Sequence, residues 1–168
     1  MRCECGSQMV ATEATSDSPY LYTLSGLKNV FLCNIMIRRC LHCKIESPII
    51  PAIGELHEVI AECLLRQPIS LSASEIRFLR KHAGLKAKEL AKRIGVTAST
   101  LSRLENGKMP ITPSADKLVR ATVAAEKNAA RAQEILRREA LLKDARTRIH
   151  ARLNIERIRD RWTAAANC

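Results

Sequence analysis

The alternation of apolar and polar residues over positions 85–106 predicts two short helices joined by a tight turn. The apolar residues recur at the three- and four-residue spacings of one helix face; they are Leu90, Ala91, Ile94, Leu101 and Leu104. Gly95 lies at the corner, where a sharp helix exit favours a residue that tolerates a positive φ. Thr97 is suited to cap the second helix. These positions together predict two helices that meet at a sharp angle.

Apolar periodicity and end signals predict further helices on both sides of this pair. Residues 55–66 form one helical segment, which ends shortly before a proline. Ser72 and Glu75 have the spacing of a capping box that begins the next helix. Thr112 and Pro113 are in N-cap and N1 order for a later helix. The residues of these two helices that we expect to face the core are Ile76, Leu79, Ala83, Leu118, Val119 and Thr122.

The two ends of the chain carry different patterns. Residues 20–24 and 30–37 predict two antiparallel strands, with a turn at residues 25–26 or 28–29. Residues 114–165 contain neither Pro nor Gly and are rich in Ala, Arg, Leu and Glu, which predicts one long helix or two helices with a bend. A partial seven-residue repeat runs along this stretch; it comprises Ile135, Leu142 and Ile149, with Ala132, Ala145, Leu153, Ile158 and Trp162 near the same stripe.

Positive charge concentrates in the second part of the chain. The formal net charge is +11 over 168 residues. Residues 1–67 carry 6 Lys or Arg and 7 Asp or Glu, whereas residues 68–168 carry 22 and 10. Such an excess favours an anionic partner. Aromatic residues are scarce, with 1 Trp, 2 Tyr and 2 Phe, which disfavours stacking platforms for single strands. Double-stranded DNA is therefore the predicted partner of the basic part.

Four of the 7 cysteines form two close pairs. Cys3 and Cys5 are one pair, and Cys40 and Cys43 are a C-x-x-C pair. Two residues apart on an extended chain, the side chains of the first pair point to the same side. Four thiolates complete the tetrahedral shell of Zn²⁺ and leave no open position for catalysis. The sequence predicts one structural zinc ion per chain.

Two other residues compete as zinc ligands. Cys33 lies in an apolar run that predicts a strand, so a buried thiol is the favoured interpretation. His42 lies between two cysteines and is expected to face solvent. Cys63 follows the helical pattern of residues 55–66 and is expected in the core.

Short polar side chains occupy the predicted outer face of the helix that follows Thr97, with an arginine one turn further on. A slim helix N-terminus lets the backbone approach base edges in the major groove. We expect Ser99, Thr100 and Arg103 to contact bases. The residues expected to contact phosphates are Lys86, Lys88, Asn106 and Lys108. The candidate DNA-binding residues are Lys86, Lys88, Thr97, Ala98, Ser99, Thr100, Ser102, Arg103, Asn106 and Lys108.

Residues 74–124 resemble the helix-turn-helix of the lambda-repressor/Cro (XRE) family. The residues that carry the resemblance are Leu85, Glu89, Leu90, Ala91, Gly95, Val96, Leu101, Ser102, Glu105, Asn106 and Gly107. The resemblance implies a five-helix DNA-binding domain whose second and third helices form the recognition unit. Many members carry a glutamine where this chain has Ala87, and the neighbours Lys86 and Lys88 are the candidates for a phosphate contact there.

The order of cysteine pairs, small sheet and helix-turn-helix resembles the YgiT/MqsA type of zinc-finger protein. In that family the C-terminal domain binds the operator of its own operon. Its best-known members are antitoxins whose zinc domain helps to bind a ribonuclease toxin. The resemblance implies an autoregulating transcriptional repressor, with a toxin-neutralising antitoxin as the alternative.

The predicted fold is mainly α with a small N-terminal β module. Residues 1–50 form the zinc-binding module, 51–72 a linker and connecting helix, 73–125 the helix-turn-helix domain and 126–168 a long basic helix. Three interpretations of the last segment stay open: a dimerisation or packing helix, a DNA-contacting arm, and a solvated tail. The arm would use Arg131, Arg137, Arg138, Arg146, Arg148 and Arg152.

The functional expectation is a homodimeric repressor that binds a palindromic operator and is not an enzyme. The 4 histidines are scattered without paired carboxylates, and the chain has no glycine loop that could hold a phosphate. The N-terminus lacks an apolar signal core, and no segment approaches the roughly 20 apolar residues of a membrane span. We therefore expect a cytoplasmic protein with reduced thiols.

Overall fold

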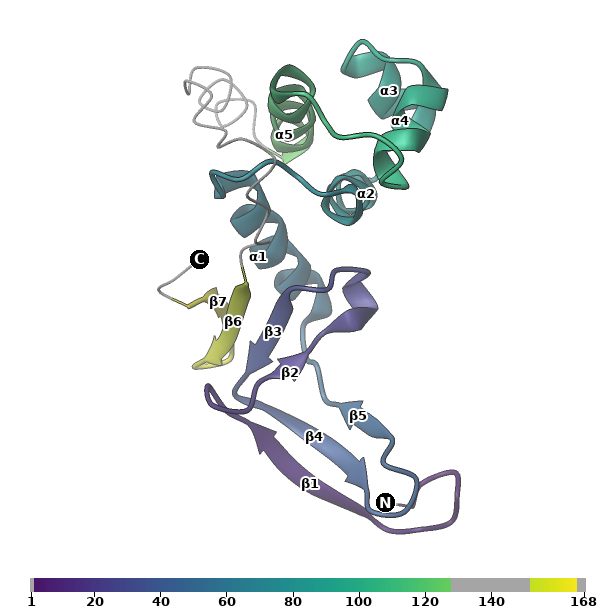
Figure 1. The fold of residues 1–168 in the computed structure, drawn as a ribbon. Helices are drawn as coiled ribbons and strands as arrows, with labels where there is room; N and C mark the ends of the chain where they lie inside the picture. The colour runs from purple at the N-terminus through teal and green to yellow at the C-terminus, as the bar shows by residue number, and fades with distance from the viewer. Residues whose placement is uncertain (1, 128–151, 166–168) are drawn as a thin grey trace. The chain divides into compact units, whose positions relative to one another are not determined.

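The computed structural model describes residues 2–127 and 152–165 (Figure 1). The chain divides into two compact units. The first, here the cysteine unit, comprises Met1–Thr23, Lys28–Ile60 and Arg152–Cys168. The second, the helical unit, comprises Leu24–Leu27 and Ala61–Ala151. In chain order, the helical unit is thus inserted into the cysteine unit.

The cysteine unit contains two small sheets. The first has the order β1-β4-β5 and is antiparallel, with β1 Met9–Ala14, β4 Ile35–Cys40 and β5 Glu46–Pro48. The second has the order β2-β3-β6-β7, with β2 Tyr20–Leu21, β3 Val30–Cys33, β6 Leu153–Ile158 and β7 Arg161–Ala164. Strands β3 and β6 are parallel, so the last described segment of the chain completes a sheet that begins near the N-terminus (Figure 1).

The antiparallel pair predicted near the N-terminus is confirmed, but both strands are shorter than the predicted ranges 20–24 and 30–37. Tyr20 pairs with Leu32 across β2 and β3, and a 3-10 turn at Thr23–Ser25 follows β2. The predicted strand over residues 30–37 is divided at Asn34, whose φ is 58°. The Asn34 amide donates to the Ala14 carbonyl at 2.7 Å, and the chain passes there from one sheet to the other. A single residue with positive φ explains the division.

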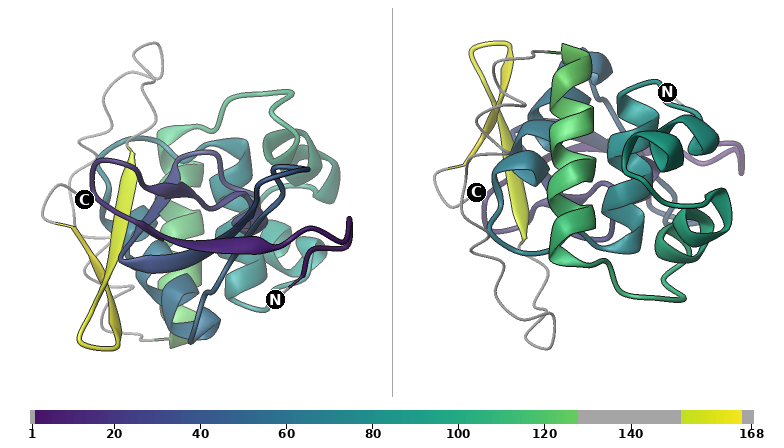
Figure 2. Two further views of the ribbon diagram at one scale, coloured as in Figure 1. Left: turned by 90° about the horizontal axis from the view of Figure 1, so that it is seen from below. Right: turned by 90° about the horizontal axis from the view of Figure 1, so that it is seen from above.

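The prediction of a long C-terminal helix is wrong for residues 153–164. These residues form the β6–β7 hairpin, seen in yellow in Figure 2. Leu153, Ile155 and Trp162 are buried at 2%, 0% and 3% exposure, respectively. Pairing with β3 and burial of these side chains outweigh the helix propensity of the segment. The rest of that prediction falls on residues 128–151, which lie outside the described residues. They include Ile135, Leu142 and Ile149 of the partial heptad and five of the six arginines of the predicted DNA-contacting arm.

Helix α1, Ile53–Arg66, begins in the cysteine unit and ends in the helical unit. It contains the predicted segment 55–66. The helical unit continues with α2 Ala73–His82, α3 Ala87–Arg93, α4 Ala98–Glu105 and α5 Pro113–Lys127. The predicted capping box of Ser72 and Glu75 is present. The amide of Ala115 donates to the Thr112 hydroxyl at 3.2 Å, which confirms the predicted start of α5.

Leucines and a valine from four helices form the core of the helical unit. Leu79, Leu90, Leu101 and Val119 are each fully buried. Leu118 was expected to join them, and this is wrong, because it is 38% exposed. One helical turn offers only part of its circumference to a core, and Val119 occupies that side at the adjacent position.

A buried arginine links α5 to the segment between α1 and α2. Arg120 Nε donates to Asp116 Oδ2 at 2.7 Å, and its two Nη atoms donate to the carbonyls of Gln67 and Ile69 at 3.1 and 2.7 Å. Asp116 Oδ1 accepts from the Leu71 amide at 2.7 Å. Arg120 and Asp116 are 5% and 1% exposed. The carbonyls and amide of the connecting segment thus find partners on α5, which fixes where α2 begins.

Candidate nucleic-acid interface and metal centre

Helices α3 and α4 meet at the predicted sharp turn. Gly95 has φ +72°, as the turn requires. The Thr97 hydroxyl accepts a hydrogen bond from the Thr100 amide at 3.1 Å, which confirms Thr97 as the N-cap of α4. Ala91 is 2% exposed, so the helices pack closely where they cross. The local geometry of the helix pair therefore follows from residues that the sequence identifies.

The outer face of α4 presents the residues expected to contact bases. Ala98, Ser99, Ser102 and Arg103 are exposed. Among the described residues, none forms a hydrogen bond or ion pair with the Arg103 guanidinium. Thr100 is half-buried, and its hydroxyl lies 2.9 Å from that of Thr97. The two threonines thus stabilise the start of the helix, while Ser99 and Arg103 remain available to a partner.

The lysines expected to contact phosphates lie at the start of α3 and in the loop after α4. Lys86, Lys88 and Lys108 are exposed. Lys86 is the N-cap position of α3, and its amide donates to Glu89 Oε2 at 2.7 Å. The backbone of Lys86 is thereby anchored at the first turn of α3, close in sequence to Lys88.

Asn106 is engaged inside the helical unit. Its Nδ2 donates to the Ser102 carbonyl at 2.7 Å, and its Oδ1 accepts from Arg77 Nη2 at 2.7 Å. The observed role of Asn106 is to close the end of α4. A phosphate contact by this residue stays a prediction.

An ion pair that the sequence did not reveal joins α2 to the end of α4. Arg80 Nε and Nη2 donate to the two carboxylate oxygens of Glu105 at 2.6 and 3.0 Å. Glu105 is 9% exposed, and its hydrogen bonds raise the pKa of Arg80 above its usual value. Arg77 adds a hydrogen bond to the Glu105 carbonyl at 3.0 Å. Glu105 belongs to the residues of the XRE resemblance, but its arginine partner lies 25 residues earlier in the chain and carries no local signal.

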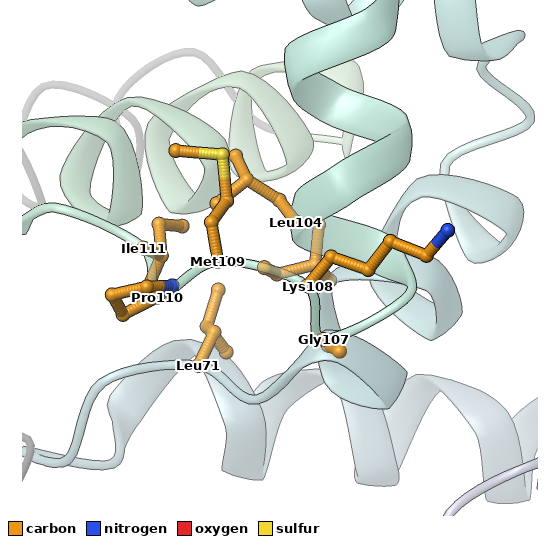
Figure 3. Close-up of a pocket in the computed structure, with 9 residues that line it drawn as sticks. Leu71, Leu104, Gly107, Lys108, Met109, Pro110 and Ile111 are labelled. Atoms are coloured by element: carbon orange, nitrogen blue, oxygen red, sulfur yellow. The ribbon is translucent and has the colours of Figure 1, made fainter.

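A cavity of about 300 Å³ lies beside the loop that leaves α4 (Figure 3). Seven of the nine residues that line it have apolar side chains, and the side chain of Lys108 extends away from the cavity. The lining residues labelled in Figure 3 are Leu71, Leu104, Gly107, Lys108, Met109, Pro110 and Ile111.

The cysteine unit brings together the four predicted metal ligands. The sulfur atoms of Cys3, Cys5, Cys40 and Cys43 all lie within 4.8 Å of one another. Cys3 Sγ is 3.4 Å from Cys43 Sγ, and Cys5 Sγ is 3.5 Å from Cys40 Sγ. Within the described part of the chain, they form the single cluster of three or more Cys, His, Asp or Glu side chains that could hold a metal ion.

Two tight turns supply these ligands. The Gly6 amide donates to the Cys3 carbonyl at 2.8 Å, and Gly6 has φ +85°. The Lys44 amide donates to the Cys40 carbonyl at 3.0 Å. The register of β1 and β4 pairs Met9 with Cys40, which brings the two turns to the same end of the sheet.

The cluster fits a tetrahedral thiolate site. Four sulfurs at about 2.3 Å from a Zn²⁺ ion would be about 3.8 Å from each other, close to the observed separations. The backbone and side chain of Ser7 lower the pKa of Cys5 to about 5. For Cys43, the Ile45 amide lowers the pKa, but hydrogen bonds with Cys3 and Cys40 outweigh it and raise the value to about 12. Metal binding requires thiolates, so a bound ion would displace the protons that these sulfurs share.

The rival ligands lie elsewhere. Cys33 is 6% exposed on β3, where burial raises the pKa of its thiol. Cys63 is 8% exposed in α1, as expected of a core residue. His42 is exposed and does not belong to the cluster.

Comparison with known proteins identifies the class of the helical unit. A helix-turn-helix family model matches residues 76–121, which extend from α2 into α5. No curated protein and no solved structure matches the chain. Residues 76–121 are therefore an XRE-type helix-turn-helix domain, which is the domain of a DNA-binding regulator. The resemblance of the whole chain to the YgiT/MqsA type is not confirmed. Among the described helices, none has the length and apolar character needed to span a membrane.

Proposed function

We propose that this chain is a sequence-specific transcriptional repressor that binds double-stranded DNA as a homodimer and regulates its own operon. The observation that carries the proposal is the outer face of α4, where Ser99, Ser102 and Arg103 are exposed on a helix-turn-helix domain. Arginine forms bidentate hydrogen bonds with guanine in the major groove. In this proposal Arg103 and Ser99 contact bases, while Lys86, Lys88 and Lys108 neutralise phosphates.

The proposed mechanism is steric. Dimers of helix-turn-helix proteins place two recognition helices about one turn apart, or ~34 Å, on a palindromic site. Occupation of such a site over a promoter excludes RNA polymerase. The basic excess of residues 68–168 supplies the electrostatic attraction that brings the protein to DNA. In this proposal the protein acts in the cytoplasm, because it binds the promoter of its own operon there.

We further propose that the cysteine cluster holds one structural Zn²⁺ ion. Four sulfur ligands are the donor set that zinc prefers, and they leave no open position for a substrate. We assign no catalytic role to the chain. The ion would join the turn after Cys3 to the end of β4 and so stabilise a small sheet.

The test begins with a pool of duplexes that have a randomised core, incubated with the purified full chain. We expect enrichment of an inverted repeat whose half-sites are about one helical turn apart. Native mass spectrometry of the same sample should show two chains and one zinc ion per chain. Failure to enrich any sequence, with the chain folded and metal-loaded, would overturn the proposal.

A second candidate function is that of an antitoxin, favoured by apolar side chains on the surface of the cysteine unit. Leu41 and Ile45 are 61% and 54% exposed next to the metal ligands, and Met36 and Ile49 are each 42% exposed. Exposed apolar groups of this kind mark surfaces that bind proteins. A gene for a small ribonuclease beside this one, and loss of its activity when the chain is added, would support this candidate. A Leu41→Lys variant that still inhibits fully would contradict the use of this surface.

A further inference from the structure

Within the cysteine unit, the β6–β7 hairpin is held by strand pairing and by the buried Trp162 side chain. Strand β6 pairs with β3, from Val30 with Leu153 to Cys33 with Glu156. The Trp162 indole donates to the Pro51 carbonyl at 2.9 Å, and the ring is 3% exposed. A hairpin held in this way presents its turn and its outer face in one defined conformation.

The turn consists of Arg159 and Asp160. Ile158 pairs with Arg161, so these two residues alone connect the strands. Their φ values are 47° and 65°, as in the two-residue turns that match the twist of a hairpin. Arg159 and Arg161 are both exposed, one in the turn and one in the first position of β7.

Positive charge in the cysteine unit is concentrated on this hairpin. Residues 2–60 carry five Lys or Arg and six Asp or Glu, whereas residues 152–165 carry four Arg and two acids. Two of the four arginines have partners. Arg157 Nη2 is 2.7 Å from Asp160 Oδ1. Arg152 Nε donates to Asn154 Oδ1, and its guanidinium carbon lies 4.1 Å from the centroid of the Phe31 ring. The guanidinium groups of Arg159 and Arg161 have no hydrogen-bond or ion-pair partner among the described residues.

We infer that Arg159 and Arg161 form a second contact surface for DNA, which binds the phosphate backbone without regard to sequence. The guanidinium fork matches the geometry of a phosphate group. Such contacts add affinity and orient the protein but carry no sequence information. This inference rests on the proposed function, in which the helix-turn-helix domain already binds duplex DNA.

The salt dependence of binding tests the inference. The probe is a mixed-sequence duplex about 30 base pairs long, because each phosphate that the protein no longer neutralises reduces the slope of log K against log salt by about 0.9 on any sequence. We expect Arg159→Gln and Arg161→Gln each to reduce the slope by about this amount. Lys28→Gln removes the same charge from an exposed site of the same unit and should leave the slope unchanged. The fluorescence of Trp162, the single tryptophan, verifies that the hairpin remains packed in each variant.

Three results would overturn the inference, and they can be told apart. If the hairpin variants keep the full slope while Arg103→Ala still reduces operator discrimination, the hairpin does not contact DNA and the proposed function stands. If the unmodified chain shows no salt-dependent binding to any duplex, both proposals fail. A drop that Lys28→Gln reproduces would show a net-charge effect and also contradict the hairpin contact.

Discussion

Arg80 on α2 donates two hydrogen bonds, of 2.6 and 3.0 Å, to the carboxylate of Glu105 at the end of α4. Glu105 is the last residue of the helix that is expected to enter the major groove. The ion pair therefore holds the recognition helix against the first helix of the domain. Arg80 and Glu105 side chains are only 14% and 8% exposed, so water competes weakly for either group.

Glu105→Gln should destabilise the helical unit strongly. Removing one partner of a buried pair leaves the other charge uncompensated and costs on the order of 3 kcal/mol. Glu126→Gln is the matched control, because Glu126 pairs with Arg93 at the surface. Their side chains are 31% and 45% exposed, and exposed pairs contribute about 1 kcal/mol or less to the free energy of unfolding. Urea unfolding of both variants measures the difference. Equal losses of unfolding free energy would contradict the structural role of the Arg80–Glu105 pair.

Asp116→Asn tests the buried arginine that links α5 to the segment before α2. The substitution removes the charge that faces Arg120 and should cost on the order of 3 kcal/mol of unfolding free energy. Asp160→Asn makes the same chemical change in the hairpin turn, where the side chain is 91% exposed, and should cost well under about 1 kcal/mol. Asparagine also tolerates the positive φ of that position. Thermal unfolding of the two variants should show a lowered midpoint for Asp116→Asn alone.

Zinc binding should release protons and weaken as the pH falls. At neutral pH the Cys43 thiol, with a pKa of about 12, is protonated and must lose its proton to the solvent, whereas Cys5, with a pKa of about 5, is already a thiolate. Below about pH 5, Cys5 also becomes protonated in the metal-free form, so the affinity should fall more steeply there. Titration calorimetry in buffers of different ionisation enthalpy counts these protons. An affinity independent of pH between 5 and 7 would exclude thiolate ligation.

Single cysteine variants assign the ligands. Cys40→Ser should lose the zinc ion, because the sulfur of Cys40 is within 4.8 Å of the other three ligands. Cys33→Ser changes a buried thiol outside the cluster and should retain one zinc ion per chain. The zinc content of each purified variant distinguishes the two. Loss of zinc from Cys33→Ser, with Cys40→Ser still loaded, would reverse the assignment.

The sequence predicted correctly those features that depend on residues close together in the chain. Thr97 and Ser72 are recognisable as caps because a cap depends on a few neighbouring residues, and the structure contains both. The convergence of Cys3 with Cys43 was predictable because metal-ligand spacing is itself a sequence pattern. The helix pair α3–α4 was predictable for the same reason, since Gly95 and the apolar spacing define it together.

Features that depend on distant partners were not predictable. Residues 153–158 have a helix-forming composition, and they become a strand because β3 offers a parallel edge more than 100 residues earlier in the chain. Arg120 finds its carbonyl partners at Gln67 and Ile69, which no periodicity connects with it. Asn34 divides one apolar run between two sheets through its own backbone conformation. In residues 153–158, pairing with β3 outweighs the local helix propensity.

The central claim is that α4 recognises a DNA sequence, and the most direct test compares Arg103→Ala with Lys88→Gln. Both variants are titrated by fluorescence anisotropy with the enriched operator, with single-base variants of it and with an unrelated duplex. We expect Arg103→Ala to lose roughly 1–3 kcal/mol on the operator and to relax discrimination at one base pair, while Lys88→Gln weakens binding to every duplex alike. If Arg103→Ala binds every duplex as the unmodified chain does, with operator discrimination intact, recognition by this face of α4 is wrong.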